Sequence, residues 1–158
     1  MTESIVTNEG LPVFTDDVLA NYRLTQDGEV DFIMMCQRAR TGKDSVVSAM
    51  LGSEVIADQP CTVLASAGSK VFAGNGAVVM ADLNCTVTAY AGAEVHAKYG
   101  SRITAKAGSK IFVYPGAAID AEAGATLMIP AGLSQDYGQG VQIIELPNAN
   151  HEGTKTLN

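Results

Sequence analysis

The sequence predicts an all-β fold, a right-handed parallel β-solenoid with a short helical cap at its N-terminal end. Two observations predict it: an eight-residue repeat without gaps over residues 46–134, and a core composition of small and β-branched side chains. Hydrophobic residues make up 47% of the 158 residues, whereas aromatic residues make up 6% and Trp is absent. The apolar material therefore suffices for a continuous core, but only for a thin one.

The repeat unit has the form V-x-A-x-x-G-[small]-x. Its third position is Ala in all units but two, which have Val113 and Ile129, and its sixth is Gly except at Pro60 and Asn84. Such self-similarity at a fixed period is the signature of a repeat architecture. The first positions are Val47, Val55, Val63, Val71, Val79, Val87, Val95, Ile103, Ile111, Ile119 and Leu127.

Each octad predicts one short strand and one turn. Positions 7, 1 and 3 alternate with positions 8 and 2, so the first set points inward and the second outward. Positions 4 to 6 form the turn, where Gly at position 6 supplies a positive φ. Asn84 tolerates that conformation and Pro60 does not, so the corner at Pro60 is expected to differ.

The number of octads per coil has two solutions. Two octads give a flattened solenoid with two facing sheets, and three give a triangular one. The inward residues are mostly Ala, Ser or Cys with one larger side chain per strand, which fills a thin space but leaves voids in a wide one. A match between residues 58–62 and 82–86, at a spacing of 24, argues for three. Two octads per coil are favoured.

A family resemblance also implies two octads per coil. Residues 97–104, A-K-Y-G-S-R-I-T, resemble the octapeptide of bacterial ice-nucleation proteins, whose tandem repeats are taken to form 16-residue coils. Ice binding in that family needs Thr-x-Thr at positions 8, 1 and 2 of many units, and here only Thr86-Val87-Thr88 fits, so ice binding is not expected. The repeat resembles, more distantly, the bactofilins, bacterial β-solenoids that polymerise end to end.

The flanks are expected to close the solenoid. Residues 1–45 form a capping segment, with one helix from Thr15 to about Leu24 and a second from Glu29 to Arg40. Residues 135–158 contain a closing strand over 141–146 and a polar, mobile tail. A terminal cap is expected because an open end exposes unpaired backbone groups.

Composition narrows the class of partner and the compartment. The formal charge of −7 argues against nucleic-acid binding. Cys36, Cys61 and Cys85 lack metal-ligand spacing and are expected to be reduced thiols, with the last two buried. No secretory signal and no membrane span is visible, so a cytoplasmic location is expected, with signal-less export or a phage particle left open.

No catalytic constellation can be assembled from the sequence. The two histidines, His96 and His151, have no suitable partners, and the pair Asp120 and Glu122 is interpreted as solvated charges. We therefore expect a non-enzymatic protein without cofactor or metal. Cys61 and Cys85 occupy inward positions, which fits inert thiols.

The main functional prediction is an apolar ladder. With two octads per coil, one sheet displays Leu64, Met80, His96, Phe112 and Met128 outward, with Val78 beside them. The opposite sheet displays Ile56, Phe72, Thr88, Thr104 and Asp120. Apolar stripes of this kind mark contact surfaces. We expect a structural or interaction scaffold that forms a homo-oligomer, most simply a dimer, with a protein partner as a further possibility.

The alternative prediction is a ligand-binding module of a larger surface or phage-like assembly. Lys98, Arg102, Lys106 and Lys110 form a basic run that suits an anionic group, and Tyr90, Tyr99 and Tyr114 suit a glycan. In a two-octad coil, however, the four cations are spread over both faces and both edges, which dilutes any patch.

Overall fold

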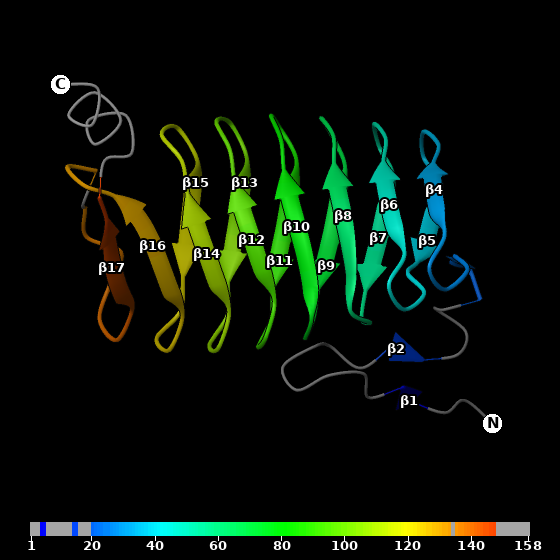
Figure 1. The fold of residues 1–158 in the computed structure, drawn as a ribbon, viewed down its shortest axis with the longest axis horizontal. Helices are drawn as coiled ribbons and strands as arrows, with labels where there is room; N and C mark the ends of the chain where they lie inside the picture. Colours follow the sequence, from blue (N-terminus) through cyan, green and yellow to red (C-terminus); the bar gives the residue numbers. More distant parts are fainter. Residues whose placement is uncertain (1–3, 6–13, 16–19, 134, 148–158) are drawn as a thin grey trace, which may run out of the picture.

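The protein is a parallel β-solenoid with two facing sheets, and its computed structural model describes residues 4–5, 14–15, 20–133 and 135–147. The strands stack along the long axis of the molecule (Figure 1). Each strand pairs in parallel with the strand sixteen residues away, as Val79 does with Val63 and Val95. Two octads per coil are thereby confirmed.

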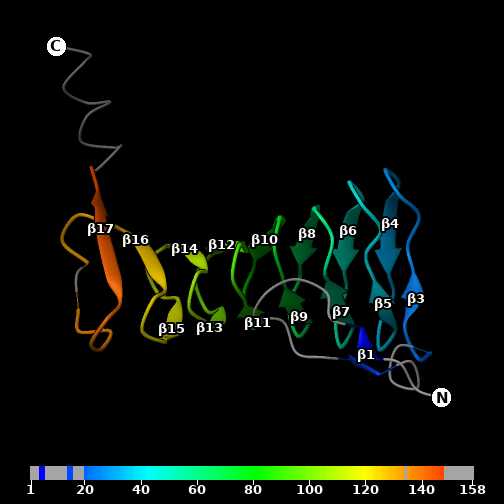
Figure 2. The ribbon, with the colours of Figure 1, turned by 90° about the horizontal axis from the view of Figure 1, so that it is seen from below.

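From β3 to β16, successive strands along the chain alternate between an eight-stranded sheet and a seven-stranded sheet. The first comprises β4 (Val30–Ile33), β6 (Val46–Ala49), β8 (Cys61–Ala65), β10 (Ala77–Ala81), β12 (Glu94–Ala97), β14 (Lys110–Val113), β16 (Thr126–Pro130) and β17 (Gln142–Leu146). The second comprises β3 (Arg23–Leu24), β5 (Arg38–Arg40), β7 (Glu54–Ala57), β9 (Lys70–Ala73), β11 (Thr86–Ala89), β13 (Arg102–Ala105) and β15 (Ala118–Ala121). Figure 2 shows the two layers from below. Separately, β1 (Ser4–Ile5) and β2 (Phe14–Thr15) pair antiparallel.

The predicted alternation of inward and outward residues holds along the solenoid. Val87 and Ala89 on β11 have no exposed surface, whereas Thr86 between the turn and Val87 is exposed. Inward serines at position 7 are satisfied locally, because Ser69 Oγ donates to the carbonyl of Ser66 and Ser109 Oγ to that of Lys106, each at 2.6 Å. The core is thin and continuous because each coil contributes the same small side chains.

The corners follow the predicted glycine pattern. Gly108 has φ +83°, and Asn84 takes the same left-handed region with φ 59°. The corner residues of successive coils also form a ladder of backbone hydrogen bonds, in which Gly92 N donates to Gly108 O at 3.0 Å and Gly108 N to Gly124 O at 2.9 Å. Pro60 is not among the residues with positive φ and has no N–H to donate, so its corner differs as expected.

The expected helix over residues 29–40 is wrong. These residues form β4 and β5, which pair with β6 and β7 in the solenoid register. The octad continues through them, since Gly28, Cys36, Asp44 and Gly52 lie eight residues apart and all have positive φ. Pairing with the stacked strands therefore outweighs the local helix propensity. The solenoid begins at β3, N-terminal to the expected boundary at residue 46.

The other flanking predictions divide into two groups. Of the first expected helix, residues 15–24, residues 16–19 lie outside the described residues. Thr15 belongs to β2, residues 20–22 form a turn and Arg23–Leu24 form β3. The closing strand is confirmed, because β17 pairs in parallel with β16. The predicted mobile tail over residues 148–158 lies outside the described residues.

Charged residues stand at inward positions on the terminal coils. Arg23 pairs in register with the buried Ala39, and Asp31 with the buried Val47, so both occupy core positions of the first coil. Their side chains form an ion pair at 2.6 Å, which holds the pKa of the Asp31 carboxyl below its usual range. At the other end Glu145 pairs in register with the buried Ile129. Inward charges on terminal strands are a known protection against further strand pairing.

Candidate functional site

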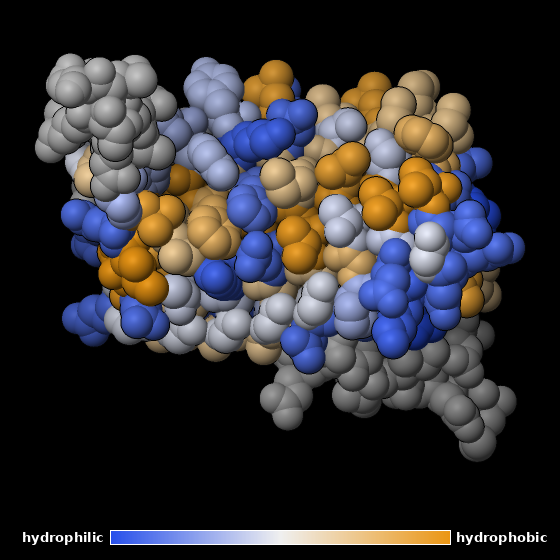
Figure 3. All heavy atoms as spheres, viewed as in Figure 1, coloured by the Kyte–Doolittle hydropathy of each residue, from blue (hydrophilic) through white to orange (hydrophobic). Residues whose placement is uncertain are grey.

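The outward ladder of the eight-stranded sheet has the predicted register. Leu64, Met80, His96, Phe112 and Met128 lie opposite one another on successive strands, and Val78 lies on β10 two residues before Met80. The ladder extends further than predicted, because Ile144 on β17 follows Met128. Figure 3 views this face, hereafter the sheet face, and shows apolar side chains along it.

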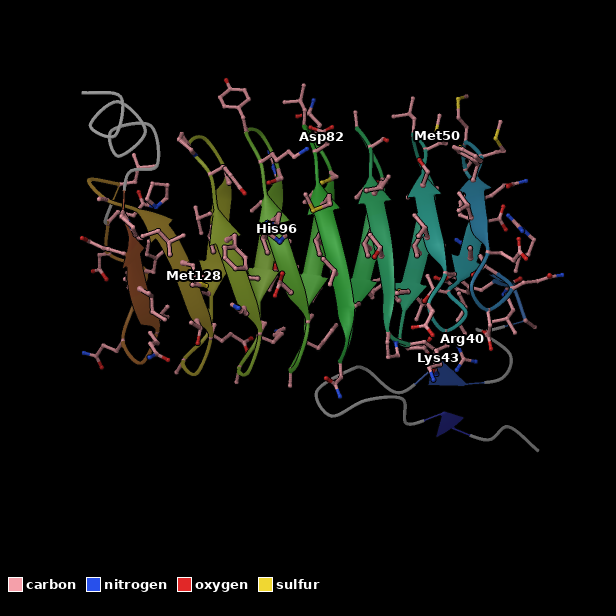
Figure 4. All side chains as sticks on the ribbon, in the orientation of Figure 1. Arg40, Lys43, Met50, Asp82, His96 and Met128 are labelled. Carbon is pink, nitrogen blue, oxygen red and sulfur yellow. The ribbon has the colours of Figure 1, made fainter. Side chains whose placement is uncertain are left out.

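The sheet face is a packed surface at its centre and more open towards its ends. Leu64 is 43% exposed and Ile144 is 38% exposed, whereas Met80, Phe112 and Met128 are partly buried by their neighbours. The rings of His96 and Phe112 stack with centroids 4.5 Å apart and planes 4° apart. Figure 4 labels His96 and Met128 on this face. The two rings therefore pack face to face across neighbouring strands.

The charges on the sheet face are locally balanced. Glu94 Oε1 lies 3.1 Å from His96 Nε2, and Glu94 Oε2 lies 3.7 Å from Lys110 Nζ. The Lys110 ammonium also lies 4.9 Å from the centroid of the Phe112 ring, a cation–π contact. One anion and one cation therefore border the aromatic stack, and the face carries little net charge there.

The opposite sheet has a more polar outward ladder. Phe72, Thr88, Thr104 and Asp120 lie in the predicted register, and Lys70 lies over the ring of Phe72. Ile56, the first predicted member, has no exposed surface. The apolar character of the ladder is thus lost along this sheet, whereas it continues along the sheet face.

The structure also reveals an apolar edge that the sequence analysis missed. The turns that follow the strands of the eight-stranded sheet meet at one edge, where Figure 4 labels Met50 and Asp82. The fifth octad position at this edge is apolar or aromatic in every coil: Met35, Leu51, Ala67, Leu83, Tyr99, Pro115 and Ala131. The opposite edge has Asp27, Lys43, Gln59, Asn75, Ala91, Ala107, Ala123 and Gln139. Sorting alternate octads separately would have shown this difference.

The basic run does not form one site. Lys98 lies in a turn at the apolar edge, Arg102 on β13, Lys106 in a turn at the opposite edge and Lys110 on β14. Lys106 forms an ion pair with Glu122 at 2.5 Å, which raises the pKa of the lysine. Lys110 is the cation beside Glu94 described above. The structure thus spreads these cations, as a two-octad coil requires.

The tyrosines are likewise divided between edges. Tyr99 and Tyr114 lie at the apolar edge and are 71% and 44% exposed, whereas Tyr90 lies in a turn at the opposite edge and is half-buried. The Tyr114 ring lies 6.4 Å from that of His96. The three rings therefore do not form a single platform for a glycan.

Two of the three thiols are buried as predicted. Cys61 and Cys85 are 6% and 0% exposed, and burial raises the pKa of each thiol to about 11. Cys36 is exposed, at a corner with φ 61°. A thiolate is the reactive form, so the buried pair combines low access with a low thiolate fraction at neutral pH.

This difference predicts a stepwise thiol titration. One equivalent of thiol per chain is expected to react with a maleimide in the native protein, and three after denaturation. Mass spectrometry of the labelled protein should place the native label on Cys36. Rapid native labelling of Cys61 or Cys85 would contradict the burial described here.

Open pockets lie at the N-terminal end of the solenoid. One of them, of about 580 Å³, is lined in part by Tyr22, Arg23, Cys36 and Arg38, but Arg23 is already paired with Asp31 and Tyr22 with Glu54. In the part of the chain that the structure describes, no cluster of three or more His, Cys, Asp or Glu side chains could hold a metal ion.

The comparisons add no family to this description. No protein-family model, curated protein or solved structure matches the chain. Among the described residues there is no helix long and apolar enough to cross a membrane. The function must therefore be argued from the surfaces of the solenoid itself.

Proposed function

We propose that the protein is a non-catalytic structural scaffold that self-associates through the sheet face. The observation that supports this most directly is the outward ladder, which places apolar side chains on consecutive strands from Leu64 to Ile144, interrupted only by the stacked His96. A contiguous apolar surface is covered by another molecule more often than scattered exposed residues are.

The dimensions of the sheet face suit a modest interface. Strands at ~4.8 Å spacing give a length of ~34 Å for the eight-stranded sheet, and extended residues at ~3.3 Å give a width of ~15 Å. The face thus offers about 500 Å² in projection, near the lower end of specific interfaces, which bury ~800 Å² per partner on average. We therefore expect association at micromolar concentrations.

The terminal coils argue for lateral rather than end-to-end association. A second copy stacked on the N-terminal end would cover Arg23 and Asp31, and one stacked on the C-terminal end would cover Glu145. Charges placed between stacked coils would lose their hydration, which disfavours stacking unless each finds a partner. At the centre of the sheet face the charged groups of Glu94 and Lys110 lie 3.7 Å apart, so each already has a partner of opposite charge.

A double substitution tests the proposal. Changing Met80→Asp and Phe112→Lys places two charges in the middle of the sheet face without altering an inward position. In a two-fold dimer each change occurs on both subunits, so the effect on association is doubled. We expect the wild-type protein to sediment as a dimer at tens of micromolar and the double variant as a monomer, with unchanged circular dichroism.

The matched control lies on the other sheet. Thr88→Asp together with Thr104→Lys introduces the same charges on adjacent strands of the seven-stranded sheet and should leave the dimer intact. A monomeric wild-type protein at this concentration would refute self-association outright. So would a double variant of the sheet face that sediments like the wild type.

A further inference from the structure

We infer that the partner at the sheet face is a second copy in one defined orientation, with the two-fold axis parallel to the strands and midway between β10 and β12. This inference rests on the proposed function and adds the pairing of residues across the interface. The axis reverses the direction of the solenoid, so β10 faces β12 of the partner and β8 faces β14. An isologous interface of this kind must be self-complementary.

The charges at the apolar edge favour this axis. Asp82 follows β10 and Lys98 follows β12 at the same position of the turn, sixteen residues apart. Both are exposed, and neither belongs to an ion pair within the described residues. The two-fold axis brings each Asp82 opposite Lys98 of the other copy, which creates two symmetry-related ion pairs. Complementary charges of this kind fix register in an interface.

The same two-fold axis also brings apolar residues of the two copies opposite each other. Leu64 on β8 comes opposite Phe112 on β14, and Met80 opposite His96. At the ends of the sheet face Phe32, which is 60% exposed, comes opposite Ile144. Leu64, Phe32 and Ile144, three exposed apolar side chains of the sheet face, therefore each meet an apolar or aromatic partner.

The other possible two-fold axis, parallel to the solenoid, gives a poorer match. It places each strand opposite its own copy with the strand direction reversed, so His96 faces His96. Asp82 then lies opposite Val78 instead of Lys98, so the pairing of opposite charges at the apolar edge is lost. Lys98 would meet Glu94, whose carboxylate oxygens already contact His96 and Lys110.

Charge reversal provides the first test. Asp82→Lys places four cations around the axis in the inferred dimer, and we expect the dissociation constant to rise at least about tenfold at low salt. Adding Lys98→Asp restores alternating charges and should return the dissociation constant to near the wild-type value. Thermal melts of the variants separate this effect from any change in fold stability. An unchanged dissociation constant for Asp82→Lys would overturn the inferred axis.

Cross-linking tests the orientation directly. The background variant Cys36→Gly removes the exposed thiol and suits the positive φ of that corner, while the buried Cys61 and Cys85 stay unreactive. Ser48→Cys on β6 and Met128→Cys on β16 are then prepared separately. The inferred axis brings residue 48 opposite residue 128 of the partner, at the ~10 Å separation of packed sheets. A short bis-maleimide should therefore cross-link a mixture of the two variants, and neither variant alone.

Each outcome separates the inference from the proposed function. A background variant that is monomeric by sedimentation refutes self-association, and the orientation with it. A dimer in which Ser48→Cys cross-links to itself has the axis parallel to the solenoid, which overturns the inference and leaves the proposed function standing. A dimer without any cross-link in the mixture also overturns it. If either cysteine variant fails to dimerise, the charge-reversal series decides.

Discussion

Val87→Asp is expected to abolish soluble, folded protein. Val87 lies in the middle of β11, between Val71 and Ile103 of the neighbouring strands, and has no exposed surface. An aspartate there would be either a charged carboxylate without water or a protonated carboxyl without a hydrogen-bond partner in the apolar core. An uncompensated buried charge destabilises a protein by about 3–5 kcal/mol, a large part of the ~5–15 kcal/mol available to a typical domain.

The neighbouring residue supplies the control. Thr88→Asp introduces the same side chain one position later, where it points outward and is partly exposed. Surface changes of this kind usually alter the free energy of unfolding by less than about 0.5 kcal/mol. The soluble fraction after expression and the midpoint of urea unfolding measure both variants. Equal behaviour of the two variants would contradict the inward and outward assignment of the whole repeat.

The octad could be predicted from sequence because each of its parts has a single structural role. An inward Val, a small Ala and a corner Gly repeat in register, so one interpretation explains all three. The first coils were missed because Cys36 and Asp44 replace glycine at their corners and Arg23 and Asp31 replace valine at their core positions. Those substitutions fit the end of a solenoid, where there is no further coil to pack against, but they hide its repeat.

The candidate site shows the same division between what sequence can and cannot predict. The register of the sheet face followed from the assumption of two octads per coil, because outward residues sixteen apart must then be neighbours. The stack of His96 on Phe112 and the position of Glu94 beside His96 and Lys110 depend on rotamers, which the repeat does not specify. The apolar edge was accessible in principle, since it requires only that alternate turns be compared.

Gly108→Val is expected to be among the most damaging changes at a corner. Gly108 has φ +83°, a conformation that β-branched residues strongly resist, at about 1–3 kcal/mol for the backbone strain alone. A Cβ atom at this position would also lie 2.9 Å from Cβ of Ala91 and 3.2 Å from its Cα, closer than ordinary contact. Strain and crowding act together, because relieving the contact would shift the coil beneath and its backbone ladder.

Gly132→Val separates the two contributions. Gly132 has nearly the same φ, +86°, but a Cβ atom there would have no atom within 4 Å. It should therefore show the backbone strain without the crowding, and its melting temperature should fall less than that of Gly108→Val. Replacing Asn84, which already has φ 59°, by glycine should change the melting temperature little. A Gly108→Val variant that melts like the wild type would mean that the sixth position does not govern the corner, and equal losses for Gly108→Val and Gly132→Val would mean that contact between coils adds nothing to the strain.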